Sequence, residues 1–246
     1  MSNNKIFGIN PVTEALKARR PLQRLFIAEQ RKSERDIQAI LRLAREQDIE
    51  IRFVSRDFLT HDLPNAVHQG VVAVTSPTSY KSLDDIMRIP QERNEPALFL
   101  LLDGVEDPRN LGAVLRTAEA SGVHGIIIPE RRAASLNETV AKTAAGALEY
   151  VPVVRVTNFV NTIEELKKNG IWIAGAEAGA GMSYWNADFS SPTALVLGGE
   201  GKGIRRLVKD HCDYLISLPL RGNINSLNVS VAAGVLLYEV LRQRTS

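Results

Sequence analysis

The fold is decided in the last quarter of the chain by the stretch Leu195-Val196-Leu197-Gly198-Gly199-Glu200-Gly201-Lys202-Gly203-Ile204. A second stretch of the same kind follows it, Leu218-Pro219-Leu220-Arg221-Gly222-Asn223-Ile224-Asn225-Ser226-Leu227-Asn228-Val229-Ser230-Val231-Ala232-Ala233-Gly234. Each begins as an apolar run typical of a β-strand, breaks into a polar loop and resumes as an apolar segment. Loops of this kind, at the carboxyl ends of strands in a parallel sheet, present backbone groups to a small ligand.

From residue 97 onward, strand and helix patterns alternate. Apolar runs predict strands at 97–102, 125–129, 151–156, 171–174, 194–197 and 215–218. Helical patterns cover 113–121, 138–147, 160–168 and 229–242. This alternation predicts an α/β domain over 97–246, built on a parallel sheet with helices on both faces.

The first part of the chain is predicted to form a smaller α/β domain, residues 1–76. Its patterns indicate helices at 12–18 and 36–47, and strands at 25–28, 49–54 and 71–74. The segments 76–80 and 90–96 look the least like parts of a core. We therefore expect residues 77–96 to be a linker.

The composition is ordinary for a globular protein of 246 residues, with 44% hydrophobic and 24% charged residues. Because Cys212 is the single cysteine, an intramolecular disulfide and a multi-cysteine zinc site are excluded, and no metal is predicted. No apolar run reaches the length of a membrane span. The residues after Met1 lack the apolar core of a signal peptide, so we expect a cytoplasmic protein without a membrane partner.

A basic stretch near the N-terminus has two possible interpretations. Its cations are Lys17, Arg19, Arg20, Arg24, Arg31, Lys32 and Arg35. A solvated surface is the usual explanation of such a run. A surface for nucleic-acid phosphates is the alternative, but the net charge of only +2 gives it no independent support.

Polar residues follow the predicted strand that ends at Asp103. A helix is predicted to start near Asn110, which can cap it, and Arg116 lies about two turns further on. Taken alone, a capping Asn and an exposed helical Arg explain this pattern without any function.

The two late loops have compositions that packing alone does not require. The glycines at 198–203 allow close backbone approach, but they lack the spacing of a dinucleotide-binding fold and of a P-loop, which argues against a nicotinamide-dependent oxidoreductase. The other loop carries Asn223, Asn225, Ser226 and Asn228, more than a single helix cap needs. Such neutral groups suit the placement of a ribose, a base or an amino-acid moiety.

Together these residues resemble the three motifs of the SpoU branch of the SPOUT RNA methyltransferases. The motifs are Asn110 with Arg116, the Gly-Glu-Gly loop at 199–201, and the segment 226–232. The resemblance covers roughly 97–244 in order and spacing. Gly199 stands where Ser or Ala is commonest, and all three residue types are small. Residues 8–12 and 68–73 resemble that family's RNA-binding domain, which is similar to a ribosomal protein.

The resemblance implies a catalytic domain that forms a deep trefoil knot and binds S-adenosylmethionine. The cofactor-binding residues it implies are Gly198, Gly199, Glu200, Gly201, Ile216, Leu218, Ser226 and Leu227. The catalytic residues it implies are Asn110, Arg116, Glu200, Ser226 and Asn228. It also implies a homodimer with the active site at the interface.

The implied reaction transfers a methyl group to the ribose 2′-oxygen of a guanosine in the peptidyl-transferase region of 23S rRNA. In related enzymes the arginine that matches Arg116 is assigned as base or activator. Because a guanidinium normally stays charged, positioning a phosphate and stabilising alkoxide charge are the alternative roles. An RNA substrate favours the interpretation of the basic stretch as a surface that contacts RNA phosphates.

Two alternative functions remain at this level. One is a methyltransferase of the same chemistry that acts on tRNA, since the catalytic motifs do not specify the RNA. The other is an RNA-binding, ribosome-protecting or ribosome-assembly protein that keeps the fold without catalysis. The complete motif set argues against the second, and the N-terminal domain favours rRNA.

Overall fold

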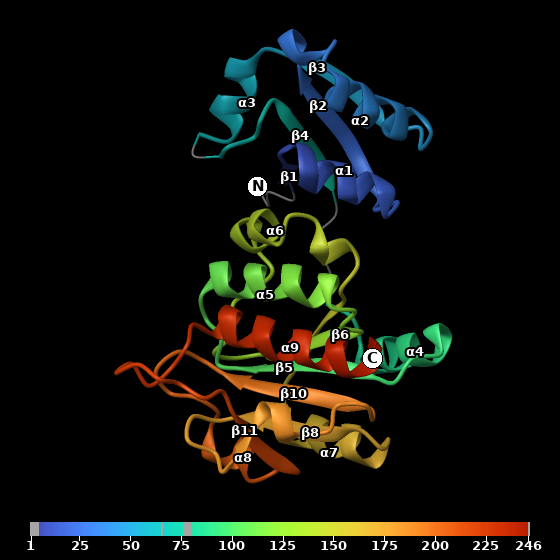
Figure 1. The fold of residues 1–246 in the computed structure, drawn as a ribbon. Helices are drawn as coiled ribbons and strands as arrows, with labels where there is room; N and C mark the ends of the chain where they lie inside the picture. Colours follow the sequence, from blue (N-terminus) through green and yellow to red (C-terminus); the bar gives the residue numbers. More distant parts are fainter. Residues whose placement is uncertain (1–4, 65, 76–79, 246) are drawn as a thin grey trace. The chain divides into compact units, whose positions relative to one another are not determined.

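The computed structural model describes residues 5–64, 66–75 and 80–245 (Figure 1). They form two compact units. The first contains the described residues up to Thr75 together with Leu136–Tyr150, and the second contains Tyr80–Ser135 with Val151–Thr245. Residues 76–79, where the linker is predicted to begin, and residues 1–4 lie outside the described residues.

The first unit is built on a four-stranded sheet in the order β1-β4-β2-β3. Its elements are β1 (Lys5–Phe7), α1 (Ile9–Lys17), β2 (Leu22–Ala28), η1 (Glu29–Arg31), α2 (Arg35–Arg45), β3 (Glu50–Val54), α3 (Arg56–Asp62) and β4 (Val71–Thr75). The two predicted helices and three predicted strands are confirmed within two residues at each end, except that β2 and α1 each start three residues earlier than predicted. The sequence did not predict β1 and α3, because each is too short to show a period.

A segment from the second half of the chain completes the first unit. It holds α6 (Glu138–Ala144) and η2 (Ala147–Glu149), and Arg20 Nη1 donates to Glu149 Oε1 over 2.6 Å. The single helix predicted at 138–147 is wrong in its last turn, since Ala145 and Gly146 have φ values of 51° and 103°. A Cβ on Gly146 would lie 2.6 Å from Glu14 Cβ, so this turn lets the backbone approach α1 closely.

The basic stretch is largely neutralised by neighbouring acids. Ion pairs join Lys17 to Glu14, Arg20 to Glu149, Arg24 to Glu50, and Arg31 to Glu34 and Asp36. Lys32 lies over the ring of Phe53, 4.8 Å from its centroid. The net positive charge of this surface is therefore smaller than the number of cations in the sequence suggests.

The second unit contains a seven-stranded sheet in the order β7-β6-β5-β10-β8-β11-β9, and every paired strand is parallel. Its strands are β5 (Leu98–Asp103), β6 (Gly125–Pro129), β7 (Val153–Val156), β8 (Trp172–Ala176), β9 (Met182–Ser183), β10 (Thr193–Gly198) and β11 (Tyr214–Ser217). The predicted α/β domain with a parallel sheet is confirmed. β10 lies next to β5, so the loops that follow these strands start side by side. The trefoil knot stays a prediction.

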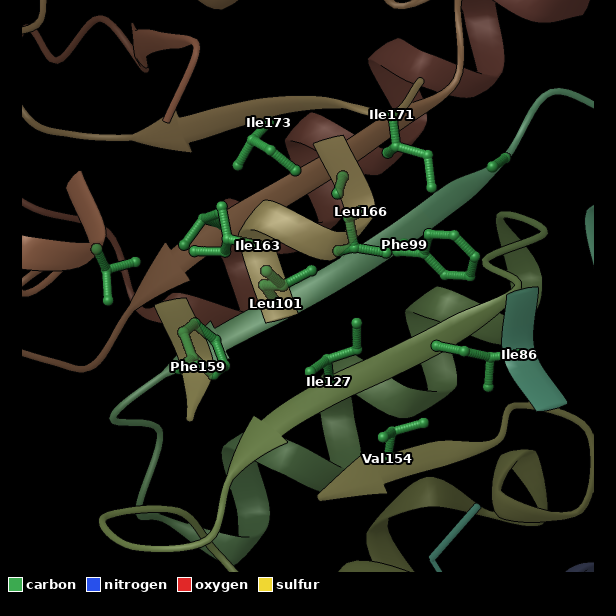
Figure 2. Packing of buried hydrophobic residues seen from close by; sticks show 14 of the residues in the cluster. Ile86, Phe99, Leu101, Ile127, Val154, Phe159, Ile163, Leu166, Ile171 and Ile173 are labelled. Atoms are coloured by element: carbon green, nitrogen blue, oxygen red, sulfur yellow. The ribbon is translucent and has the colours of Figure 1, made fainter. Parts of the chain in front are cut away.

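Helices cover both faces of this sheet. Figure 1 shows α5 (Pro108–Ala120) and α9 (Val229–Thr245) on one side of β5 and β10, with α7 (Phe159–Lys168) and α8 (Arg206–Lys209) on the other. A short η3 (Tyr184–Asn186) follows β9. Figure 2 shows the core on the α7 side, where Phe99 and Leu101 of β5 pack with Ile163 and Leu166 of α7. None of the helices in the described part of the chain is both long and apolar enough to cross a membrane.

The segment predicted to be a linker contains a helix, α4 (Leu83–Arg93). Ser82 Oγ accepts from the Asp85 amide over 3.2 Å, and Asp85 Oδ2 accepts from the Ser82 amide over 3.0 Å, which is a capping box. Ile86 is fully buried in the core of the second unit (Figure 2). The sequence analysis did not predict α4, although Leu83, Ile86 and Met87 have helical spacing, because Pro90 and the polar residues after it were interpreted as a linker.

Ser82→Ala is expected to lower the free energy of unfolding by about 1 kcal/mol, because the N-terminal cap of α4 is lost. Ser135→Ala, at an exposed position, serves as the control and is expected to change it by less than about 0.5 kcal/mol. Urea unfolding followed by circular dichroism measures both. Equal stability of the two variants would contradict a structural role for α4.

Candidate active site

Three polar side chains, distant in sequence, meet at the start of α5 and α9. Asn110 Nδ2 donates to Glu200 Oε1 over 2.9 Å, and Asn228 Nδ2 donates to the same oxygen over 2.6 Å. Asn228 Nδ2 also lies 3.0 Å from Asn110 Oδ1, to which it donates. One residue from each of the three motifs therefore takes part in a single hydrogen-bonded bridge.

The amide of Asn228 is oriented by the first turn of α9. Its Oδ1 accepts from the Ser230 amide over 2.9 Å and from Ser230 Oγ over 2.5 Å. The amide nitrogen must therefore face the opposite way, toward Asn110 and Glu200. Asn228 thus caps the helix, as its type predicts, and uses its other group in the bridge.

The predicted capping role of Asn110 is wrong. Asp107 caps α5, accepting at Oδ1 from the Arg109 amide over 2.6 Å, and Pro108 occupies the first helical position. Proline suits this position because its φ is fixed and its missing N–H has no partner to lose there. The side chain of Asn110, inside the first turn, is consequently available to Glu200.

The glycine loop after β10 folds back closely on the chain. Gly199 N donates to Asp103 O over 2.8 Å, and Gly203 N donates to Gly199 O over 3.0 Å. A Cβ on Gly198 would lie 1.9 Å from Gly203 C, and one on Gly199 would lie 2.0 Å from Gly104 O. Glycine, alanine and serine are therefore not interchangeable at position 199. Even the Cβ of alanine would push the backbone of Gly199 away from that of Gly104.

An ion pair between the buried Asp103 and the partly exposed Arg205 holds the far end of the same loop. Asp103 is 1% exposed and accepts from the Arg205 amide over 2.8 Å and from Arg205 Nε over 2.7 Å. The sequence analysis did not assign Asp103 or Arg205 a role. The available signal was a carboxylate at the end of an otherwise wholly apolar strand, a position that requires a cationic or N–H partner.

The loops enclose a cavity of about 360 Å³, which is a usual size for a small-molecule site. All eight residues predicted to bind a cofactor line it: Gly198, Gly199, Glu200, Gly201, Ile216, Leu218, Ser226 and Leu227. Further apolar lining comes from Leu197, Leu220 and Val229. The cavity therefore combines an apolar wall with exposed backbone of a glycine loop.

Glu177 adds a charge to this wall that the sequence analysis missed. It follows β8 directly, lines the cavity, and accepts at Oε1 from Lys209 Nζ over 2.5 Å. The Glu177 carboxylate is therefore fixed in place by a cation from the last residue of α8. An isolated glutamate near a strand end gave no pattern from which this pairing could be predicted.

Arg116 lies apart from the bridge. It is exposed on α5, and within the described part of the chain it neither lines the cavity nor has a hydrogen-bond or ion-pair partner. Ser226 lines the cavity without joining the bridge. The structure thus brings Asn110, Glu200 and Asn228 together, and the roles predicted for all five residues stay predictions.

The single cysteine does not supply a nucleophile. Burial raises the pKa of the Cys212 thiol to about 11, so the thiol stays protonated at neutral pH. His211 pairs instead with Glu164, with His211 Nδ1 and Glu164 Oε1 2.7 Å apart. No group of three metal-ligating side chains occurs among the residues that the structure describes.

Comparison with known families identifies this arrangement. Residues 97–238 match the SpoU rRNA Methylase family, and residues 5–81 match the family described as RNA 2'-O ribose methyltransferase substrate binding. The chain belongs to the SpoU methylase family. The bridge, the glycine loop and the cavity are thus the candidate active site of a SpoU/TrmH-family methyltransferase.

Relatives of this SpoU methylase extend over its whole length. It is 48% identical over 239 residues to the putative TrmH family tRNA/rRNA methyltransferase YacO of Bacillus subtilis, covering 97% of this chain and 95% of the relative. It is 45% identical over 244 residues to a protein of the same description from Staphylococcus aureus, covering 99% and 98% of the two chains.

A solved structure supports the same assignment. The SpoU methyltransferase AviRb from Streptomyces viridochromogenes, in complex with the cofactor AdoMet, superposes with a TM-score of 0.81 at 29% identity. The match covers 98% of this chain and 90% of AviRb. The α/β fold of this SpoU methylase, including its N-terminal substrate-binding domain, is therefore that of the family.

Gly199→Ala is expected to lower the free energy of unfolding by about 1–3 kcal/mol, since a Cβ would overlap Gly104 O. Gly181→Ala is the matched control, because a Cβ there meets no atom within 4 Å, and its change is expected to stay within about 0.5 kcal/mol. Denaturant unfolding compares the two. A Gly199→Ala variant as stable as the parent would contradict the close approach of the two loops.

Proposed function

We propose that this SpoU methylase uses S-adenosylmethionine to methylate the ribose 2′-hydroxyl of a guanosine in the peptidyl-transferase region of 23S rRNA. The observation that carries the proposal is the bridge of Asn110, Glu200 and Asn228 beside the glycine-lined cavity. Membership of the SpoU methylase family and the match of the N-terminal domain to an RNA 2'-O ribose methyltransferase substrate-binding family support it.

The lining of the cavity fits S-adenosylmethionine. Leu218 and Leu227 would pack on the adenine, and the backbone of 198–201 with Ser226 would bind its polar edges and the methionine part. The bound cofactor would supply an electrophilic methyl group on its sulfonium. AviRb, with AdoMet bound, has the same fold.

Methyl transfer to a ribose hydroxyl requires an oriented acceptor and loss of a proton. Asn110 and Asn228 both use Glu200 Oε1, and Glu200 Oε2 has no hydrogen bond to any other described residue. In the proposal, Glu200 Oε2 accepts from the substrate ribose, while the two amides hold the carboxylate in position. The guanidinium of Arg116 would bind the adjacent phosphate and stabilise the developing alkoxide.

A homodimer accounts for the position of Arg116. On α9, Val231, Val235 and Tyr238 are 51%, 36% and 53% exposed, and their spacing places them on one apolar stripe. Exposed apolar stripes of this kind mark protein interfaces. We propose that two copies associate through α9, and that Arg116, on the helix that packs against α9, completes an active site with the partner subunit.

The same proposal assigns the N-terminal domain to RNA binding. Cations that form no ion pair with another described residue, such as Arg19 and Arg35, would contact phosphates, which position a substrate without specifying its sequence. A bacterial-type rRNA substrate would be met in the cytoplasm. The predicted cytoplasmic location therefore depends on the proposed substrate.

A tRNA substrate is the second candidate. The B. subtilis and S. aureus relatives are described as tRNA/rRNA methyltransferases, which favours neither RNA over the other.

The direct experiment incubates the protein with methyl-labelled S-adenosylmethionine and, separately, unmodified 23S rRNA, bulk tRNA or precursor ribosomal particles. The labelled nucleotide is then mapped by mass spectrometry. Label on a single guanosine ribose of 23S rRNA is the expected result. Label on tRNA alone would replace the substrate, and no label on either RNA or on ribosomal precursors would contradict catalysis.

Arg116→Ala is expected to reduce methyl transfer by at least about 100-fold, because the developing charge loses its cation. Its affinity for S-adenosylmethionine should change little, since Arg116 does not line the cavity. Single-turnover rates and calorimetric titration measure the two quantities. Arg206→Ala, whose side chain is 95% exposed on α8, controls for loss of one positive charge. A large loss of cofactor affinity in Arg116→Ala would contradict the placement of Arg116 outside the cofactor cavity.

A further inference from the structure

A second cavity, of about 390 Å³, adjoins the one proposed for the cofactor. The two share Gly199, Glu200, Lys202, Gly203 and Val229 in their walls. The rest of the second cavity is lined by 103–107, Asn110, Arg132 and Arg205. Its wall therefore contains two members of the polar bridge, Asn110 and Glu200.

The charges of this second cavity are not balanced within the protein. Asp103 is neutralised by Arg205, and Glu200 Oε1 is occupied by two amides. Lys202 and Arg132 have no ion-pair partner among the described residues, and neither do the lining acids Glu106 and Asp107. Such a mixed lining suits a ligand that carries both anionic oxygens and N–H or O–H donors, as a nucleotide does with its phosphate, hydroxyls and base.

Arg132 is held at this cavity by an uncommon backbone conformation. Its φ is 61°, a region that residues other than glycine rarely occupy. The backbone is fixed on both sides, where Glu130 N donates to Val156 O over 2.8 Å and Ala134 N donates to Val105 O over 2.9 Å. Conformations of this kind persist where the surrounding structure imposes them, and they cluster at ligand-binding sites.

We propose that this second cavity binds the acceptor nucleotide of the RNA, and that Arg132 binds a phosphate of that nucleotide. The inference rests on the proposed function. It places the ribose beside Asn110 and Glu200, at the wall shared with the cofactor cavity. A guanidinium matches phosphate geometry with two parallel N–H donors, which Lys202 cannot reproduce.

The test uses guanosine 3′,5′-bisphosphate and guanosine as probes for the full-length protein saturated with S-adenosylhomocysteine. Calorimetric competition measures their affinities in the parent, Arg132→Ala, Arg132→Lys and Arg131→Ala. Arg131 is the matched control, because it is the adjacent exposed arginine and does not line the cavity. Thermal unfolding verifies that the variants are folded.

Arg132→Ala is expected to weaken bisphosphate binding by about 10- to 100-fold, the loss typical of a hydrogen bond to a charged group, and to leave guanosine affinity unchanged. Arg132→Lys should lose less, and Arg131→Ala should match the parent. No binding to the parent, no loss in Arg132→Ala, or an equal loss in Arg131→Ala would overturn the inference.

A parallel assay of methyl transfer separates this inference from the proposed function. If Arg132→Ala methylates RNA with an unchanged KM, the inference fails while the function stands. If the parent methylates no RNA but binds the bisphosphate through Arg132, the function fails while the nucleotide site stands.

Discussion

The candidate active site depends on one hydrogen-bonded contact, in which the Glu200 carboxylate accepts from the amides of Asn110 and Asn228. These asparagines are 118 residues apart in the chain, and Asn110 and Glu200 are 90 apart. The contact fixes the first turns of α5 and α9 to the glycine loop. Glu200 itself lines both cavities, where a methyl donor and an acceptor would meet.

The sheet makes this contact possible. β5 and β10 are neighbours in register from Leu98 with Thr193 to Asp103 with Gly198, so both strands end at the same level. Gly198 and Gly199 then pack against backbone at distances that admit no side chain, and the buried Asp103 binds Arg205 beyond the loop. Backbone packing and the ion pair of Asp103 with Arg205 thus define the loop on both sides of Glu200.

The sequence was sufficient for features that local patterns encode. Apolar runs located the main strands, and the glycine- and asparagine-rich loops located the cavity lining. Local patterns could not locate pairings between distant residues, such as Asp103 with Arg205, Glu177 with Lys209, or Leu136–Tyr150 with the first unit. Asn110 was misassigned as a cap because Asp107 and Pro108 supply that function locally. The chemical roles came from the family resemblance, which periodicity cannot provide.

The central claim, that the bridge works as one unit, is tested most directly by a double-mutant cycle. Single-turnover methyl transfer is measured for the parent, Asn110→Ala, Asn228→Ala and the double variant, at saturating S-adenosylmethionine. If the bridge works as one unit, the second substitution costs much less than the first, with a coupling energy of about 0.5–3 kcal/mol. Additive effects, within about 0.5 kcal/mol, would contradict it.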